Sequence, residues 1–289
     1  MESQYRKIFL ALQSPILCEH KIGPAYSSAP TLFHNHDGYE IVLYLDGPAD
    51  YYIEGNGKHL ERGDLICISP YIFHCIASNH SADYERVIIN LSEKKLRELS
   101  SQETDLSACF FQPSAQSIKL IKLNEEEIEA FCHNTTLLQN NIEANTYGSD
   151  LLTNALIIEL LVMISRHCLI DTHVKYTNIM PKIVSDTFDY LALHMNDFSM
   201  EGLSAYVQYN RDYINRCFKA VTGTSIRQYI VAKKVTLAQE LLINGCTPCD
   251  ACYGSGFHNY SNFSRTFSKQ TGLPPLQYQL HNQRADPSL

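Results

Sequence analysis

Short runs of alternating apolar and polar residues fill the chain from Phe33 to about Leu91. Tyr, Ile and Val are frequent in these runs, and turn residues such as Asp46-Gly47 separate them. Strands this short, at roughly ten-residue spacing, predict an antiparallel barrel or sandwich. The predicted strands are Tyr39 to Leu45, Asp50 to Ile53, Asp64 to Ile68 and Tyr84 to Leu91.

Beyond Ser92 the pattern changes to one that is typical of helices. The segment from Asn124 to Asn140 opens with three Glu residues, which suit a helix N-terminus. The segment from Leu151 to Ser165 is apolar on nearly every face, so it predicts a helix that is buried in its own domain or shared with a partner subunit. Residues 171–182 are polar and contain Pro181, which favours a linker before a helical remainder.

The C-terminal part repeats itself at an offset of 49 residues. Residues 210–230 and 259–279 share seven identities over 21 aligned positions. The identical pairs are Asn210 and Asn259, Arg216 and Arg265, Phe218 and Phe267, Thr222 and Thr271, Gly223 and Gly272, Gln228 and Gln277, and Tyr229 and Tyr278.

Each copy of the repeat has the signals of a capped helix. Asn at its start can accept a backbone N–H bond, and Gly at its end can adopt the left-handed conformation that stops a helix. A shorter helix is predicted before each copy, at Met200 to Gln208 and at Pro248 to Tyr253. The pattern therefore predicts two helix-turn-helix units joined by a long helix, Ile226 to Leu242. Such a pair can read successive major-groove segments about one helical turn apart.

The C-terminal residues resemble the AraC/XylS family of transcription regulators over about 105 residues. The signature comprises Gly256-Phe257, Tyr260 to Lys269, Thr271 to Pro275, and Tyr278. The resemblance implies a DNA-binding protein rather than an enzyme. By position, it also implies a set of DNA-facing residues, namely Asp212, Asn215, Arg216, Lys219, Ser261, Ser264 and Arg265. A generic helical bundle with accidental self-similarity is the alternative interpretation.

Four potential metal ligands lie in the strand-rich part of the chain. The spacing of His34, His36, Glu40 and His74, with Gly47 between, resembles the two motifs of the cupin barrel. In metal-bearing cupins such residues hold a divalent transition ion such as Fe, Mn, Ni or Zn, and imidazole and carboxylate are apt ligands for these ions. The alternatives are an effector pocket lined by the same residues without a metal, and a purely structural role.

The charge of the chain is unevenly distributed around a formal net charge of −8. Residues 1–180 carry 13 Lys and Arg against 23 Asp and Glu, a net of −10, whereas residues 181–289 carry 10 against 8, a net of +2. A polyanionic partner is thus excluded for the first part and only weakly allowed for the second. No uninterrupted apolar segment of about 20 residues predicts a membrane span, and a cytoplasmic location is expected.

Three of the ten cysteines cluster at Cys246, Cys249 and Cys252. A zinc site normally needs four ligands, and a redox Cys-x2-Cys motif is typical of a βαβ context that is absent from the pattern. The repeat instead assigns Cys249 and Cys252 to the first helix of the second unit, with Cys246 just before it, and Cys at these positions can act as a small buried hydrophobe. Redox sensing and metal binding are the alternatives.

Together these patterns predict a two-domain α+β protein. A cupin-like, effector-binding β-barrel is expected over 1–100, a helical dimerisation region over 101–175, and an all-α DNA-binding domain over 176–289. The predicted function is that of a ligand-responsive transcription regulator, which forms a homodimer and binds double-stranded DNA and a small-molecule effector without a required cofactor. The alternative is a cupin metalloenzyme, an oxygenase or isomerase, that uses the three histidines and Glu40 but leaves the tandem repeat unexplained.

Overall fold

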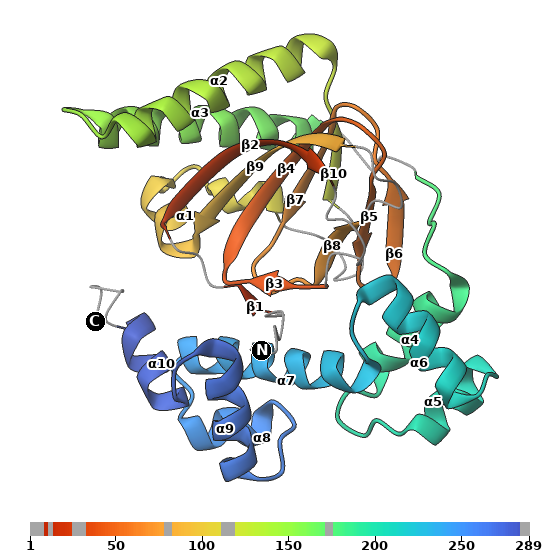
Figure 1. Cartoon of the computed structure of the whole chain (residues 1–289). Coiled ribbons are helices and arrows are strands. Elements are labelled where there is room, and N and C mark those ends of the chain that lie inside the picture. The colour runs from red at the N-terminus through yellow and green to blue at the C-terminus, as the bar shows by residue number, and fades with distance from the viewer. Residues whose placement is uncertain are drawn as a thin grey trace, which may run out of the picture. The chain divides into compact units, whose positions relative to one another are not determined.

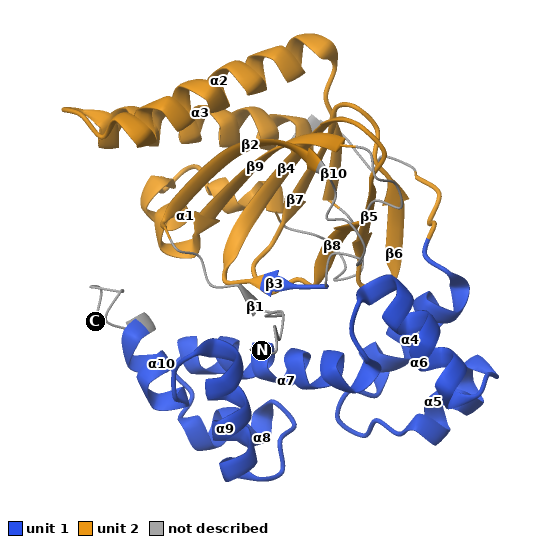
Figure 2. Ribbon diagram, in the orientation of Figure 1, with its two compact units in different colours: residues 1–11, 29–35, 180–289 blue, residues 12–28, 36–179 orange. Residues whose placement is uncertain are grey.

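The computed structural model describes residues 9–10, 14–24, 33–77, 83–110, 119–170 and 176–283. The chain forms two compact units (Figure 2). Unit 1 comprises residues 1–11, 29–35 and 180–289, and unit 2 comprises residues 12–28 and 36–179. Residues 171–175 of the expected linker lie outside the described residues.

Antiparallel sheets form most of unit 2 (Figure 1). The larger sheet has the strand order β10-β7-β4-β9-β2, and the smaller has the order β6-β5-β8. In chain order, the strands of the larger sheet are β2 (Ile16–Pro24), β4 (Gly38–Asp46), β7 (Asp64–Ile68), β9 (Asp83–Ser92) and β10 (Lys119–Lys122). Those of the smaller sheet are β5 (Asp50–Ile53), β6 (Asn56–His59) and β8 (His74–Ala77), and a separate pair joins β1 (Phe9–Leu10) to β3 (Asn35–His36).

Both faces of the central strand β4 are buried, which follows from the alternation of its side chains. Ile41 and Leu43 point to one face, where they pack in the same apolar cluster as Phe131. Val42 points to the other face, where it packs in a second cluster with Tyr51 of the smaller sheet. The even-numbered residues of β4, which include Glu40, therefore lie on the face that is shared with the smaller sheet.

Two long helices cover the first face of the larger sheet (Figure 1). They are α2 (Glu125–Ala144) and α3 (Ser149–Ile170), and they follow α1 (Glu93–Leu99) and a short 3-10 helix, η1 (Leu106–Phe110). Asn124 caps α2 by accepting the N–H of Glu127 at 3.0 Å. The expected helical region also contains a strand, β10, which pairs antiparallel with β7 and forms one edge of the larger sheet.

Helix α3 is long and apolar enough, by length and composition, to cross a membrane over Ser149–Cys168. Its residues Leu160, Leu161 and Ile164 are buried in the cluster beneath α2, although only 28% of the segment is buried. One side of the helix thus packs against the domain, and the other side is exposed.

Unit 1 contains seven helices among its described residues (Figure 1). They are α4 (Lys182–Leu193), α5 (Met200–Val207), α6 (Arg211–Thr222), α7 (Ile226–Ile243), α8 (Pro248–Gly254), α9 (Tyr260–Thr271) and α10 (Pro275–Gln283). The pairs α5–α6 and α8–α9 are the two expected helix-turn-helix units, and α7 joins them. The predicted fold class, a β-rich N-terminal domain followed by a helical C-terminal domain, is confirmed.

Unit 1 also includes a segment that sequence reasoning assigned to the first domain. Phe33 is fully buried, and its ring stacks on that of Phe188 with centroids 5.7 Å apart. Its backbone N–H donates to the carbonyl oxygen of Thr222 at 2.9 Å, and the Asn35 amide donates to the Thr236 hydroxyl at 2.8 Å. Residues 33–35 thus complete the core around α4, α6 and α7.

Candidate nucleic-acid interface and polar centre

The second helix of the first helix-turn-helix unit, α6, is fixed by its caps and by one apolar face. The Asn210 side chain accepts the backbone N–H of Tyr213 at 2.9 Å, and Gly223 ends the helix with φ of 71°. Ile214 and Phe218, four residues apart, are both fully buried. The opposite face of α6 is consequently available to a partner.

The second unit reproduces this design in α9. Asn259 accepts the N–H of Asn262 at 2.9 Å, and Gly272 takes φ of 83°. Phe263 and Phe267 are fully buried on the inner face of the helix. The last residue of each helix makes matching bonds as well, because the Thr271 hydroxyl donates to the Phe267 carbonyl at 3.0 Å, as the corresponding pair does in α6 at 2.8 Å. The predicted caps and buried pairs are therefore confirmed.

The outer face of α6 carries most of the predicted DNA-facing residues of the first unit. Asp212, Arg216 and Lys219 are exposed. The Arg216 guanidinium lies over the Tyr213 ring, 5.2 Å from its centroid, which limits the positions that this long side chain adopts. Asn215 is half-buried, and its side-chain oxygen accepts the backbone N–H of Ile226 at 3.1 Å, so it also satisfies a donor at the start of α7.

The outer face of α9 is less charged. Ser261 and Arg265 are exposed, and Ser264 is half-buried. Arg265 and Lys269 are the cations of this helix, whereas α6 carries Arg211, Arg216 and Lys219. The two units thus present different chemistry on one framework.

The cysteine cluster divides between core and surface. Cys252 is fully buried and packs with Phe263, as expected for a small hydrophobe, and burial raises the pKa of its thiol. The same expectation is wrong for Cys249, which is exposed because Ala251 and Cys252 form the inner side of the short helix α8. All ten cysteines are free thiols in the structure.

Three of the four candidate ligands in unit 2 form one buried cluster. The ligand atoms of His36, Glu40 and His74 all lie within 4.8 Å of one another. Glu40 comes from β4 of the larger sheet and His74 from β8 of the smaller, so the cluster links the two sheets. His34 is not part of this cluster, and it groups with unit 1, whereas His36 groups with unit 2.

The two imidazoles of the cluster are oriented by the backbone. Nδ1 of His36 lies 2.7 Å from the Gly38 carbonyl oxygen, and Nδ1 of His74 lies 2.9 Å from that of Ile72. A carbonyl oxygen only accepts, so each Nδ1 carries the proton that it donates. The Nε2 atom of each ring is then directed at Glu40, at 2.5 Å for His36 and 3.7 Å for His74.

The charges in the cluster support one another. Burial lowers the pKa of His36, but the hydrogen bond and the charge of Glu40 outweigh burial and raise that pKa overall. Burial raises the pKa of Glu40, but His36 and His74 outweigh it, so this pKa is well below its usual range. Asn90 on β9, directly opposite Glu40 in the sheet, donates to the carboxylate at 3.1 Å.

Sequence reasoning missed Asn90, Tyr213 and the α7-capping role of Asn215. Asn90 acts through the register of two strands that are far apart in sequence, which no local pattern reveals. A signal for Tyr213 was present, since it precedes Arg216 by three residues and therefore lies beside it on one helix. The site assignments themselves stay predictions.

Comparison with known proteins yields two family matches that cover most of the chain. The family model of the AraC-like ligand binding domain matches residues 18–161, and that of a helix-turn-helix domain matches residues 203–281. An uncharacterized HTH-type transcriptional regulator of Staphylococcus aureus (strain MRSA252) is 23% identical over 249 residues, which are 85% of this chain and 32% of the relative. This chain therefore spans about a third of the length of that relative. The probable transcriptional regulator LumQ of Photobacterium leiognathi is 23% identical over 258 residues, 86% of this chain and 91% of that protein.

Two solved structures are also similar. Fatty acid-bound ToxT from Vibrio cholerae is 13% identical, with 92% of this chain and 95% of that chain covered and a TM-score of 0.40. The DNA-binding domain of AdpA in complex with a target DNA is 22% identical, with 36% of this chain and 96% of that chain covered and a TM-score of 0.34. From the two family matches and the tandem helix-turn-helix fold, we conclude that this chain belongs to the AraC family of transcription regulators, with a ligand-binding domain followed by a DNA-binding domain.

Proposed function

We propose that this chain is a ligand-responsive, cytoplasmic transcription regulator, whose unit 1 binds double-stranded DNA and whose unit 2 binds a small-molecule effector. The observation that carries the proposal is the duplicated unit, in which α6 and α9 have the same caps, the same buried pair and an unburied outer face. A second helix held in this way is the element that enters a major groove. Effector binding shifts the population of DNA-binding states through its different affinity for each.

The outer faces of α6 and α9 read the DNA. Arg216 and Arg265 donate hydrogen bonds to guanine, which is the commonest specific contact of an arginine in the major groove. Asp212, Asn215, Ser261 and Ser264 add hydrogen bonds to bases, and Lys219 contacts a phosphate. The proposal thus separates the residues that read bases from Lys219, which adds affinity but no sequence preference.

The first experiment measures binding of the full chain to a duplex that the chain itself selects from a random pool. Arg216→Ala is expected to weaken binding to the selected duplex by about 10- to 100-fold, in line with about 1–3 kcal/mol for one bidentate base contact. Binding to a scrambled duplex of equal length is expected to change far less. Full retention of sequence preference by the variant contradicts the assignment of Arg216.

The cluster of His36, Glu40 and His74 is the polar centre of unit 2 and fits a divalent transition ion. Two imidazoles and one carboxylate match the ligand set of Fe, Mn or Zn sites. The backbone carbonyls that accept from both Nδ1 atoms, and Asn90 beside Glu40, match the outer contacts that orient metal ligands. A bound ion would be held by Nε2 of His36, Nε2 of His74 and the Glu40 carboxylate, and it would supply a Lewis acid for an effector.

Elemental analysis tests this centre. Protein made without a His-tag in metal-supplemented medium is expected to contain one equivalent of a transition metal, and Glu40→Gln is expected to lose it. Thr135→Ser, a conservative change at another buried position of unit 2, is the control and retains the metal. Absence of metal from the wild-type protein contradicts the proposed metal site. The cluster is then only a polar lining of the effector site.

Helices α2 and α3 provide the surface through which two copies form a homodimer. Leu137 and Ile142 of α2, and Leu151, Leu152 and Ile158 of α3, are exposed although they are large and apolar. Exposed groups of this kind commonly mark an interface. Sedimentation of the double variant Leu151→Glu/Leu152→Glu is expected to give a monomer, and a dimer of unchanged stability contradicts this surface.

A further inference from the structure

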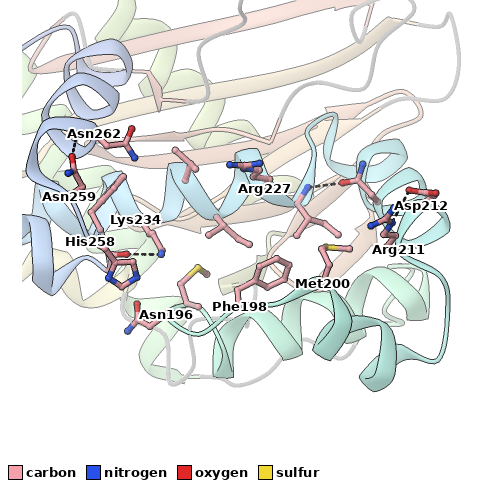
Figure 3. A pocket seen from close by; sticks show the side chains of 17 residues that line it. Asn196, Phe198, Met200, Arg211, Asp212, Arg227, Lys234, His258, Asn259 and Asn262 are labelled. Carbon is pink, nitrogen blue, oxygen red and sulfur yellow. Dashed lines mark hydrogen bonds and ion pairs between the residues drawn. The ribbon is translucent and has the colours of Figure 1, made fainter.

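A groove of about 730 Å³ lies within unit 1, between α7 and the loop that leads from α4 into α5, and residues of α6 and α9 line its two ends. Figure 3 shows Arg227 and Lys234 of α7 between Arg211 and Asp212 of α6 and Asn262 of α9. We call it the α7 groove. None of the base-reading roles proposed above requires α7 to be more than a connector.

The residues that α7 contributes to the groove lie on one side of the helix. They are Arg227, Ile230, Val231 and Lys234, at positions i, i+3, i+4 and i+7, together with Ile226 at the start of the helix. A connecting helix needs only its inner side, where Tyr229 is buried against the core. Arg227 and Lys234 are about 10 Å apart along the helix axis, because an α-helix rises about 1.5 Å per residue. This distance equals the axial rise of about three nucleotides of one DNA strand.

The groove is cationic. Its charged lining residues are Arg211, Arg227, Lys234 and Asp212, and Asp212 lies 3.9 Å from the Arg211 guanidinium. Arg227 is exposed and forms no ion pair with any residue that the structure describes. The Lys234 ammonium donates to the Gly256 carbonyl at 2.8 Å, which holds it at the groove. The net charge of the groove is complementary to phosphate.

The position of the groove decides which part of a duplex meets it. A duplex that contacts α6 and α9 in successive major-groove segments presents the minor groove and its flanking backbones to whatever lies between the two helices. In unit 1 that element is the outer side of α7. The deoxyribose rings suit Ile230 and Val231, and the phosphates suit the cations at either end.

From these observations, and resting on the proposed function, we propose that the α7 groove is a sugar–phosphate binding site, in which Arg227 and Lys234 hold the DNA backbone between the two major-groove segments. Contacts of this kind carry no sequence information but add affinity that depends on salt. They also fix the register of the two helix-turn-helix units on one duplex.

The test measures the affinity of the full chain at several salt concentrations for the selected duplex and for a scrambled duplex. Arg227→Gln is expected to weaken binding to both duplexes by a similar factor. It is also expected to reduce the slope of log affinity against log salt by about 0.9, the contribution of one phosphate contact. Lys234→Gln is expected to have the same two effects. Lys234→Arg keeps the charge and is expected to keep the wild-type slope, which separates loss of the charge from any disturbance of the fold by loss of the Gly256 contact.

Lys233→Gln is the matched control, because it removes the same charge from the neighbouring position of α7 but lies outside the groove lining. Its slope is expected to equal that of the wild type. An unchanged slope for Arg227→Gln, with the wild type still selecting a sequence, overturns the backbone site alone. If Arg227→Gln weakens binding only to the selected duplex, the backbone site is overturned and Arg227 reads bases instead. Failure of the wild type to select any sequence overturns the proposed function and this site together.

Discussion

The two helix-turn-helix units have the same framework but different faces. In both units an Asn caps the second helix, a pair of residues four apart fills the core, and a Gly with positive φ ends the helix. The outer face of α6 carries Asp212, Arg216 and Lys219, whereas that of α9 carries Ser261 and Arg265. Framework residues thus specify the helix, and the positions between them are free to differ in what they bind.

Packing around the two helices differs as well. The Phe218 ring lies 5.0 Å from that of Phe188 and 5.7 Å from that of Tyr229. The corresponding Phe267 lies among Phe263, Tyr278 and the small side chain of Cys252. Because Ala251 and Cys252 supply little apolar volume, α8 contributes less burial than a helix with larger inner residues.

The largest expected effect comes from the shared core. Phe218→Ala and Phe267→Ala each remove a fully buried ring and are expected to lower the free energy of unfolding by about 3–5 kcal/mol. Urea unfolding of the full chain, followed by circular dichroism, measures the loss. Substitution of the exposed Tyr253 by Ala is the control, and a change below about 1 kcal/mol for either Phe variant contradicts the shared framework.

A smaller effect is expected at the caps. Asn210→Ala and Asn259→Ala each leave one backbone N–H without its side-chain acceptor, which costs about 1 kcal/mol of stability. The same unfolding experiment measures it, and Asn→Asp at each position is expected to retain most of the cap. An unchanged free energy of unfolding in either alanine variant contradicts the capping role of that Asn.

The smallest effect on stability is expected at the cysteines of the second unit. Alkylation of the native protein with iodoacetamide, followed by peptide mass mapping, is expected to modify Cys249 and to spare the buried Cys252. Cys249→Ser is expected to leave the unfolding free energy within about 0.5 kcal/mol of the wild type, as is usual for surface positions. Rapid modification of Cys252 in folded protein contradicts its place in the core.

The repeat allowed the helical domain to be predicted closely, because caps and buried pairs are local signals. Pro248 to Tyr253 and Ile226 to Leu242, for example, agree with α8 and α7 to within one residue. Four strands were also predicted from local alternation, as Asp50 to Ile53 shows, whereas β2, β6 and β8 were not. These features depend on residues that are close together in the sequence.

What the sequence did not reveal depends on contacts between distant segments. Phe33 precedes the first strongly alternating strand, and nothing local assigns it to a core with Phe188. His34 has the spacing of a ligand, but it groups with the helical unit and not with the cluster, which no local pattern reveals. The contact between Asn90 and Glu40 follows from strand register, which the sequence alone leaves open.

The central claim is that each helix-turn-helix unit reads its own major-groove segment. Methylation interference at guanine N7 on the selected duplex tests it most directly, because N7 lies in the major groove. We predict two groups of interfering guanines about 10 base pairs apart, of which Arg216→Ala loses one and Arg265→Ala the other. A single group of guanines, or the loss of both groups in either variant, would contradict the claim.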